Sequence, residues 1–443
     1  MAKKAPDVME QLTSLCKRKG FIFQSSEIYG GINGCWDYGP LGIELKKNLQ
    51  EAWWRWMTIE HDDIEGLDAS ILMHPRVWEA SGHVSEFTDP LVDCTNCKGR
   101  FKADALESDQ CPVCGMKGTF TEPRQFNLML KTFLGPVQDD AAAVYLRPET
   151  CQGIYVDYQS VATAMRRRVP FGIAQVGKAF RNEINPRNFI FRSREFEQME
   201  MQFFVKPGTD VEWYETWRDK RFEYYKTLGI RPEKLRLTPH EKLAHYAAAA
   251  VDVEYEFPFG WGEIEGIHNR TDFDLTRHTE FSGKDLSWFD DQTRERFMPY
   301  IIETSSGLNR TLLAFMADAF EVEELEKDTR TVLHFHPRIA PVKAGIFPLV
   351  KRDGMPEIGR EIEKSLNPFF RVQYDEGGAV GRRYRRQDEI GTPFCITVDS
   401  QTLEDGTVTV RDRDTMEQER FPKDNLVQVL AQKMATWQRP ARS

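Results

Sequence analysis

The stretch 180–204 constrains this chain more than any other, and it reads F-R-N-E-I-N-P-R-N-F-I-F-R-S-R-E-F-E-Q-M-E-M-Q-F-F. Because side chains alternate along a strand, it predicts a β-hairpin with one polar face. On the first strand, Arg181 and Glu183 would share that face. The second strand would add a mixed series: Arg194, Phe196, Gln198 and Glu200. The opposite side would be apolar, through Met199, Met201 and Phe203.

A face with two arginines, acids and an aromatic ring suits a flat, anionic ligand. A nucleotide meets that description, because its ring can stack on Phe196 and its phosphate can accept a fork of donors from Arg181. The alternative is a solvated edge hairpin with ordinary surface charge.

Length and charge limit the classes of protein to which this chain can belong. A chain of 443 residues allows about three domains. The net charge of −10 argues against a protein that coats nucleic acid indiscriminately, although a local basic surface stays possible. No apolar run reaches the roughly 18 residues of a membrane span. The N-terminal M-A-K-K-A-P-D lacks the apolar core of a secretory signal, so we expect a cytoplasmic location.

Four cysteines have the spacing of a metal site: Cys94, Cys97, Cys111 and Cys114. Two C-x-x-C pairs at this separation predict one tetrahedral zinc ion with four thiolate ligands. Four protein ligands leave no open position, so the zinc would be structural. Disulfides are not expected without a secretion signal.

Two further strings carry polar side chains suited to a small ligand. R-P-E-T-C-Q-G (147–153) places Glu149 at an extended turn, where it can bind a small polar group, although a surface turn is the alternative. In I-E-T-S-S-G-L-N-R (302–310), Glu303 and Ser305 share a strand face. A helix would begin after them, with Arg310 in its first turn, where anions bind favourably.

The segment after about Pro337 alternates strands and helices, which predicts a separate α/β domain. Helices are expected at Met355–Leu366 and Lys423–Trp437, and a strand at Phe394–Val398. An arginine-dense run follows Gly377-Gly378, and it predicts a loop that contacts RNA. Its members are Arg382, Arg383, Arg385 and Arg386.

These strings resemble the signature motifs of the class II aminoacyl-tRNA synthetases. The hairpin is similar to motif 2, and 302–310 is similar to motif 3, with Asn309 where the general pattern has a second glycine. Helix Pro40–Met57, a strand near Ile64–Met73 and then Pro75 have the outline of motif 1. W-E-A-S-G-H (78–83), T-E-P-R-Q-F-N-L-M (121–129) and G-R-R-Y-R-R-Q-D-E-I-G-T-P (381–393) are similar to bacterial-type, homodimeric glycyl-tRNA synthetases, and the likeness covers nearly the whole chain.

The resemblance implies an α/β fold whose α+β catalytic core is an antiparallel sheet flanked by helices. Residues 1–93 would hold the first part of this core with motif 1, and 94–118 the zinc-knuckle insertion. Residues 119–334 would hold motifs 2 and 3 and a helical insertion near 207–250. Residues 335–443 would be the anticodon-binding domain.

The resemblance also implies an activity: glycine and ATP give glycyl-adenylate and pyrophosphate, and the glycyl group passes to the 3′ end of tRNA. Mg²⁺ would accompany ATP, zinc would be structural, and the enzyme would be a homodimer. The implied catalytic residues are Arg181, Glu183 and Arg310. The implied ATP contacts are the same three with Arg192 and Phe196. The implied glycine contacts are Glu149, Glu303, Ser305, Arg270 and Glu265, and those to tRNA are the arginines of 382–386.

Three alternatives remain at this point. A synthetase-like binding protein would have lost the motif arginines, which are present here. An enzyme that aminoacylates a carrier protein would lack the C-terminal domain. Synthetases for threonine, serine or proline share the class, but the cysteine pairs and the string E-I-E-G (263–266) favour glycine. Glu265 and Arg270 in that region could also form a structural ion pair.

Overall fold

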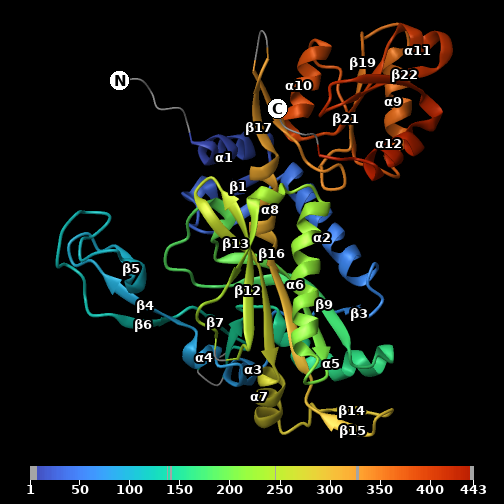
Figure 1. Ribbon diagram of the computed structural model, residues 1–443. Helices are drawn as coiled ribbons and strands as arrows, with labels where there is room; N and C mark the ends of the chain where they lie inside the picture. The colour runs from blue at the N-terminus through green and yellow to red at the C-terminus, as the bar shows by residue number, and fades with distance from the viewer. Residues whose placement is uncertain (1–6, 137, 140–141, 245, 326–328, 440–443) are drawn as a thin grey trace.

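A seven-stranded sheet lies at the centre of the computed structural model, which describes residues 7–136, 138–139, 142–244, 246–325 and 329–439 (Figure 1). In spatial order its strands are β11 (Leu235–Pro239), β12 (Ala249–Phe257), β13 (Gly260–Thr271), β16 (Tyr300–Gly307), β10 (Glu195–Val205), β9 (Phe171–Phe180) and β3 (Ile64–Gly66). Neighbouring strands are antiparallel, except that β3 runs parallel to β9. This is the antiparallel core sheet that the sequence predicts.

Three helices cover one face of this sheet: α2 (Pro40–Thr58), α6 (Asp210–Thr227) and α8 (Leu308–Ala319). On α2, Leu41, Leu45, Leu49 and Trp53 recur at helical spacing and are buried. They share one apolar cluster with the sheet residues Met199, Met201 and Phe203. The apolar back of the predicted hairpin is therefore confirmed.

The other face of the sheet is divided between packing and polar side chains. Helices α5 (Cys151–Met165) and α7 (Phe273–Ser282) cover one part of it. They bury a second cluster that includes Tyr155, Tyr158, Ile173 and Phe204. The remaining part carries carboxylates, hydroxyls and amides, and it holds the candidate site.

Shorter elements surround the core. Helices α1 (Val8–Lys19), α3 (Pro75–Ala80) and α4 (His83–Glu86) belong to the N-terminal part. Three two-stranded sheets lie in the same body: β1 (Ile22–Gln24) with β2 (Trp36–Tyr38), β7 (Leu130–Phe133) with β8 (Ala143–Leu146), and β14 (Trp288–Asp290) with β15 (Glu295–Phe297). A lobe projects from this body in Figure 1 and contains β4 (Thr88–Asp93), β5 (Arg100–Lys102) and β6 (Arg124–Asn127).

The C-terminal part has its own sheet and core (Figure 1). The strand pair β17 (Phe320–Glu324) and β18 (Thr329–Leu333) precedes it. Its strand order is β20 (Val372–Tyr374), β19 (Ala344–Pro348), β21 (Phe394–Val398), β22 (Thr407–Asp412) and β23 (Gln418–Pro422). Its helices are α9 (Met355–Leu366), α10 (Val380–Ile390), α11 (Ser400–Asp405) and α12 (Leu426–Ala435). The predicted helix Met355–Leu366 and strand Phe394–Val398 are confirmed at both ends.

Two predictions of local structure are wrong. Among the described residues of 207–250, α6 is the one α-helix; a short 3-10 helix (Pro232–Lys234) and β11 follow it, and β12 begins at Ala249, inside the segment expected to be helix. The arginine run 382–386 lies on helix α10 and not in a loop. Among the residues described, no helix combines the length and apolar character that crossing a membrane requires.

Candidate active site

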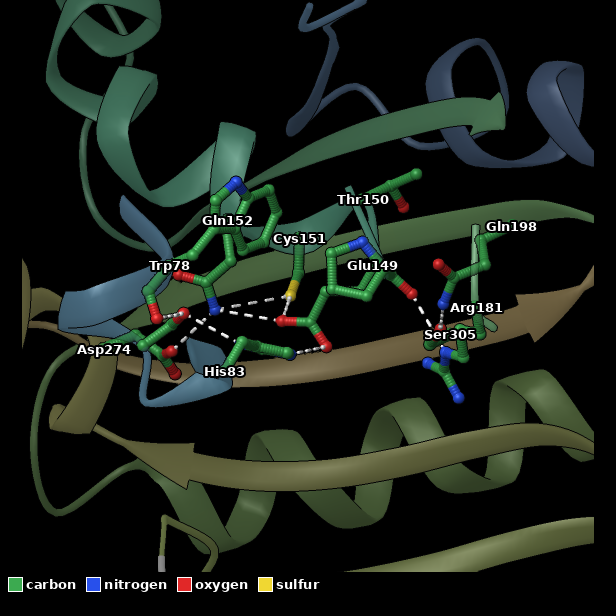
Figure 2. A network of polar contacts seen from close by, with 12 residues as sticks. Trp78, His83, Glu149, Thr150, Cys151, Gln152, Arg181, Gln198, Asp274 and Ser305 are labelled. Carbon is green, nitrogen blue, oxygen red and sulfur yellow. Dashed lines mark hydrogen bonds and ion pairs between the residues drawn. The ribbon is translucent and has the colours of Figure 1, made fainter. Parts of the chain in front are cut away.

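Three carboxylates from different elements meet on the polar face of the sheet: Glu149, Glu200 and Glu303. Glu149 lies just before α5, Glu200 on β10 and Glu303 on β16. Ser305, also on β16, pairs directly with Glu200 across the two strands. Figure 2 shows Glu149 beside His83, Cys151 and Gln152, all directed toward its carboxylate.

The Glu149 carboxylate has a partner on each oxygen. Its Oε1 accepts hydrogen bonds from Cys151 Sγ at 2.9 Å and Gln152 Nε2 at 3.0 Å. Its Oε2 lies 3.2 Å from His83 Nε2. Burial opposes ionisation, but His83 and Arg270 outweigh it and hold the pKa of Glu149 well below its usual value. Glu149 is therefore a fixed negative charge at the centre of the site.

The Glu303 carboxylate has three side-chain partners, and two of them are basic. Its carboxylate accepts from Gln202 Nε2 at 3.0 Å and from Arg270 Nη1 at 3.1 Å, and it lies 2.6 Å from His268 Nδ1. Arg270 is itself fixed by Asp274, with Nε 2.8 Å from Oδ2. Burial opposes ionisation, but Arg270 and His268 lower the pKa of Glu303. Arg270 thus belongs to the site because it binds the Glu303 carboxylate.

Glu200 differs from the other two carboxylates, because its partners are neutral. Its Oε1 accepts from Ser305 Oγ at 2.6 Å and Gln198 Nε2 at 3.2 Å, and Thr150 Oγ1 donates to Oε2. Burial, followed by the charges of Glu303 and Glu149, raises the pKa of Glu200 to about 7. A cation placed here would complete the charge balance of the cluster.

The prediction that Glu265 contacts glycine is wrong. Glu265 lies on the opposite face of β13, under α6, and is fully buried. It accepts from Arg221 at 2.7 and 3.0 Å and from Tyr225 Oη at 2.6 Å. Its buried ion pair joins the helix to the sheet, which is the structural alternative for this residue.

Arg181 is at one end of the same polar face. Its Nε donates to the Pro148 carbonyl at 3.0 Å, and its guanidinium lies 5.3 Å from the ring centroids of both Phe87 and Phe196. Strand β9 ends at Phe180, so Arg181 and Glu183 follow the strand and do not belong to it. The prediction of a strand there is wrong, but the side chains still line one cavity with Phe196.

Arg310 and Gly307 also line this cavity. Arg310 lies in the first turn of α8, as predicted, and its guanidinium is 4.6 Å from the ring centroid of Phe191. Its Nη1 lies 3.0 Å from Glu263 Oε2. Asn309 is buried beside it: its side chain donates to Tyr38 Oη at 2.7 Å and accepts from the Glu197 backbone N–H at 2.9 Å. A glycine at that position would lose both bonds.

Glu183 and Arg192 line the same cavity and lie 3.8 Å apart, from Oε2 to Nη1. Both come from the connection between β9 and β10. The cavity therefore combines three arginines with two aromatic rings, Phe191 and Phe196. Such a lining can bind a planar ring and a polyanion together.

The four predicted metal ligands meet in the projecting lobe. Cys94 Sγ lies 3.7 Å from Cys114 Sγ, and Cys97 Sγ lies 3.6 Å from Cys111 Sγ. All four sulfur atoms lie within 4.8 Å of one another. Sulfurs bound at 2.3 Å to one tetrahedral zinc would be about 3.8 Å apart. The donor set and its spacing therefore fit zinc.

The arginines of α10 have different environments. Arg383 is buried and donates to the backbone carbonyls of Pro348 and Gly378, so it supports the fold and cannot reach RNA. Arg382 is exposed. Arg385 and Arg386 are about two-fifths exposed, and Arg386 donates to Asp375.

Sequence reasoning placed Glu200 on the polar face of the hairpin without giving it a role, and it missed His83. Glu200 had a usable signal, because it follows Phe196 and Gln198 at strand spacing on the same face. His83 lies at the start of α4, and its contact with Glu149 depends on tertiary packing.

Known proteins resemble both parts of the chain. Residues 133–319 match the family model for the tRNA synthetase class II core domain (G, H, P, S and T), and residues 339–433 match the anticodon binding domain. Glycine–tRNA ligase of Treponema denticola is 57% identical over 97% of this chain and 98% of its own length. The glycine–tRNA ligases of Thermobifida fusca and Borrelia hermsii are 51% and 55% identical, over 98% and 94% of this chain and 100% and 96% of their own.

Proposed function

This chain belongs to the glycine–tRNA ligases of the class II synthetases, and we propose that the polar face of its central sheet carries out their reaction with the residues described above. In the first step, a glycine carboxylate oxygen attacks the α-phosphorus of ATP and pyrophosphate leaves. In the second step, a hydroxyl oxygen of the 3′-terminal ribose attacks the glycyl carbonyl carbon and AMP leaves. No covalent intermediate with the protein is required.

The cluster of Glu149, Glu200 and Glu303 is the observation that supports this location for the glycine-binding site. Glycine has no side chain to bind, so its ammonium group must provide recognition. Glu200 and Ser305 offer oxygen acceptors, and the hydrogen-bond donors to Glu200 are neutral side chains; Glu149 is the next carboxylate. Arg270 and His268 already bind the Glu303 carboxylate, so Glu303 would limit the size of the pocket and add a fixed negative charge to it. The crowding of these side chains supports exclusion of amino acids that have a Cβ atom.

The nucleotide would occupy the cavity between Arg181 and Arg310. Arg181 would hold the α-phosphate and neutralise the charge that develops on it, since a fixed guanidinium stabilises such a transition state. Phe196 would stack on adenine, and Arg310 would bind the other end of ATP. Glu183 and Arg192 would add contacts to the nucleotide. Mg²⁺ would enter with the phosphates of ATP as part of the substrate.

The remaining assignments concern the domains and partners. Residues 1–93 and 119–334 would form the catalytic domain, 94–118 its insertion and 335–443 the tRNA-binding domain, with Arg382, Arg385 and Arg386 facing the RNA. Two chains would associate into a homodimer, as the resemblance implies, and the enzyme would act in the cytoplasm. Light scattering on the purified protein would then give twice the chain mass of 51.4 kDa.

Zinc would fold the projecting lobe, with Cys94, Cys97, Cys111 and Cys114 as thiolate ligands. The fit of the sulfur spacing supports this assignment. Elemental analysis of the purified protein should find zinc, and Cys111→Ser should lower the zinc content by one ion per chain. Cys35→Ser, outside the lobe, is the matched control. An unchanged zinc content in the Cys111 variant would contradict the assignment.

A substrate analogue tests the proposed binding mode. Glycolate has the carboxylate of glycine but a hydroxyl in place of the ammonium group. Glycine should support exchange of labelled pyrophosphate into ATP, whereas glycolate should not. Exchange with glycolate at comparable kcat/KM would show that the carboxylate cluster does not recognise the ammonium group, even though the enzyme activates its substrate.

A further inference from the structure

A second group of metal-ligating side chains lies beside the glycine pocket and has no part in the proposed reaction. His240 Nε2 lies 2.9 Å from Asp252 Oδ1, and the rings of His240 and His268 are 5.8 Å apart. One ligand atom from each of the three residues lies within 4.8 Å of the others. Ligands about 2.1 Å from one ion are about 3.0 Å apart at right angles and about 3.4 Å apart in a tetrahedral site, so the His240–Asp252 spacing fits the first geometry and is also that of an ion pair.

The backbone brings these residues together on one face. His240 directly follows β11, Asp252 is on β12 and His268 is on β13, so adjacent strands supply one ligand each. Asp252 pairs with Gly266, and a Cβ atom there would lie 2.8 Å from His268 Cε1 and 3.7 Å from Asp252 Oδ1. The glycine therefore keeps the space between the ligands open.

The contacts of His268 provide an independent observation. Its Nδ1 lies 2.6 Å from Glu303 Oε2, and an N–H at that position donates to the carboxylate. In that tautomer Nε2 carries the free lone pair that a metal requires. Histidines that bind metals usually donate their other ring N–H to a carboxylate in this way, which fixes the ring and increases its basicity.

We propose that His240, Asp252 and His268 form a binding site for a divalent transition-metal ion such as Zn²⁺, next to the glycine pocket. Two imidazoles and a carboxylate form a borderline donor set suited to zinc and its neighbours, and less suited to magnesium or calcium. His240 and Asp252 are partly exposed, so the ion can exchange with solvent and water can complete its coordination. This site is separate from the four-cysteine site, and the hydrogen bond between His268 and Glu303 joins it to the proposed glycine contacts.

The ion acts on the enzyme through Glu303. An ion at His268 Nε2 displaces the proton that this nitrogen holds when the ring is charged, and its double charge leaves more positive charge beside the Nδ1–H that binds that carboxylate. Glu303 then has less negative charge to offer in the glycine pocket. Occupancy of the site therefore raises the KM for glycine several-fold, whereas the KM for ATP stays constant.

Cobalt(II) titration of the metal-free, full-length protein tests the proposal. Thiolate ligands give cobalt an intense charge-transfer absorption, whereas a site of histidines and a carboxylate gives only weak visible bands. The wild-type protein should bind two ions per chain by calorimetry, one with each signature. His240→Ala and the gentler His240→Gln should both lose the ion without the sulfur signature and keep the other.

Control variants distinguish a metal site at these three residues from an ordinary ion pair between His240 and Asp252. His74→Ala, which removes an exposed imidazole elsewhere, should bind both ions as the wild type does. Glu303→Gln should weaken the histidine site about 10- to 100-fold, as the loss of an outer-shell partner does. A wild-type protein with no ion beyond the sulfur-bound one would overturn the proposal. So would His240 variants that bind cobalt unchanged. If the sulfur signature is absent as well, the four-cysteine assignment fails separately.

Discussion

Ser305 Oγ donates a 2.6 Å hydrogen bond to Glu200 Oε1 across the paired strands β16 and β10. The two residues are 105 positions apart in the sequence, yet they present one polar edge to the space beside Glu149. Ser305, Gln198 and Thr150 occupy three of the roughly four lone-pair sites of the carboxylate, which leaves one for an ammonium group. Substitutions at this pair therefore test the proposed recognition of glycine most directly.

Replacement of Glu200 by glutamine should reduce kcat/KM for glycine about ten- to hundredfold, because a hydrogen bond to a charged group contributes about 1.5–3 kcal/mol. The protein should not lose stability, since the change removes a buried charge. Pyrophosphate exchange at varied glycine measures the effect. Glu256→Gln, on strand β12 and paired with Lys234, should behave as the wild type. An unchanged KM for glycine in Glu200→Gln would contradict the assignment.

The KM for glycine should rise as the pH falls below about 7, because the raised pKa of Glu200 causes it to take up a proton there and lose its charge. In the Glu200→Gln variant this limb should be absent. The effect on stability has the opposite direction. A carboxyl whose pKa is raised by folding binds its proton more tightly in the folded state. Its contribution is present below the usual pKa of 4.5 and is lost as the pH rises through about 7.

Arg181→Lys should lower kcat for pyrophosphate exchange about 100- to 1,000-fold, as the loss of one transition-state donor does, with a smaller change in the KM for ATP. Lysine keeps the charge but not the planar fork that contacts Pro148 and the rings of Phe87 and Phe196. Arg187→Lys is the matched control, since Arg187 is exposed in the same connection. Equal kcat values in the two variants would exclude Arg181 from the chemical step.

Glu265→Gln should destabilise the protein and leave the KM for glycine unchanged. Arg221 would be left buried without its carboxylate, and the loss of one partner of a buried ion pair costs about 3–5 kcal/mol. Urea unfolding followed by tryptophan fluorescence measures the loss. A raised KM in a stably folded variant would instead return Glu265 to the glycine site.

The sequence predicts elements well where one apolar pattern decides the structure. Helix α2 was expected at Pro40–Met57 and ends one residue later, because its leucines and Trp53 define a single buried stripe. Strand β21 is confirmed at both ends for a similar reason, since all five of its residues are buried. The alanines at the start of β12, Ala249 and Ala250, have helical propensity, but pairing with β13 decides their conformation.

Prediction of the site from the sequence is limited by a β-bulge, by a strand end and by tertiary contacts, none of which has a local sequence signal. Glu263 and Glu265 are two positions apart, so simple alternation places them on one face. A bulge opposite Val253 and Glu254 shifts the register, so Glu263 faces Arg310 whereas Glu265 faces Arg221. Arg181 was assigned from its motif although the strand stops before it. His83 had no local signal, because only tertiary packing brings it to Glu149.

The most direct test of the account is ATP–pyrophosphate exchange, measured with each of the twenty amino acids in turn and without tRNA. The carboxylate cluster and its crowded surroundings predict exchange with glycine alone. Comparable exchange with alanine or serine would contradict the proposed selection of glycine, and absence of exchange with glycine would contradict the proposed site as a whole.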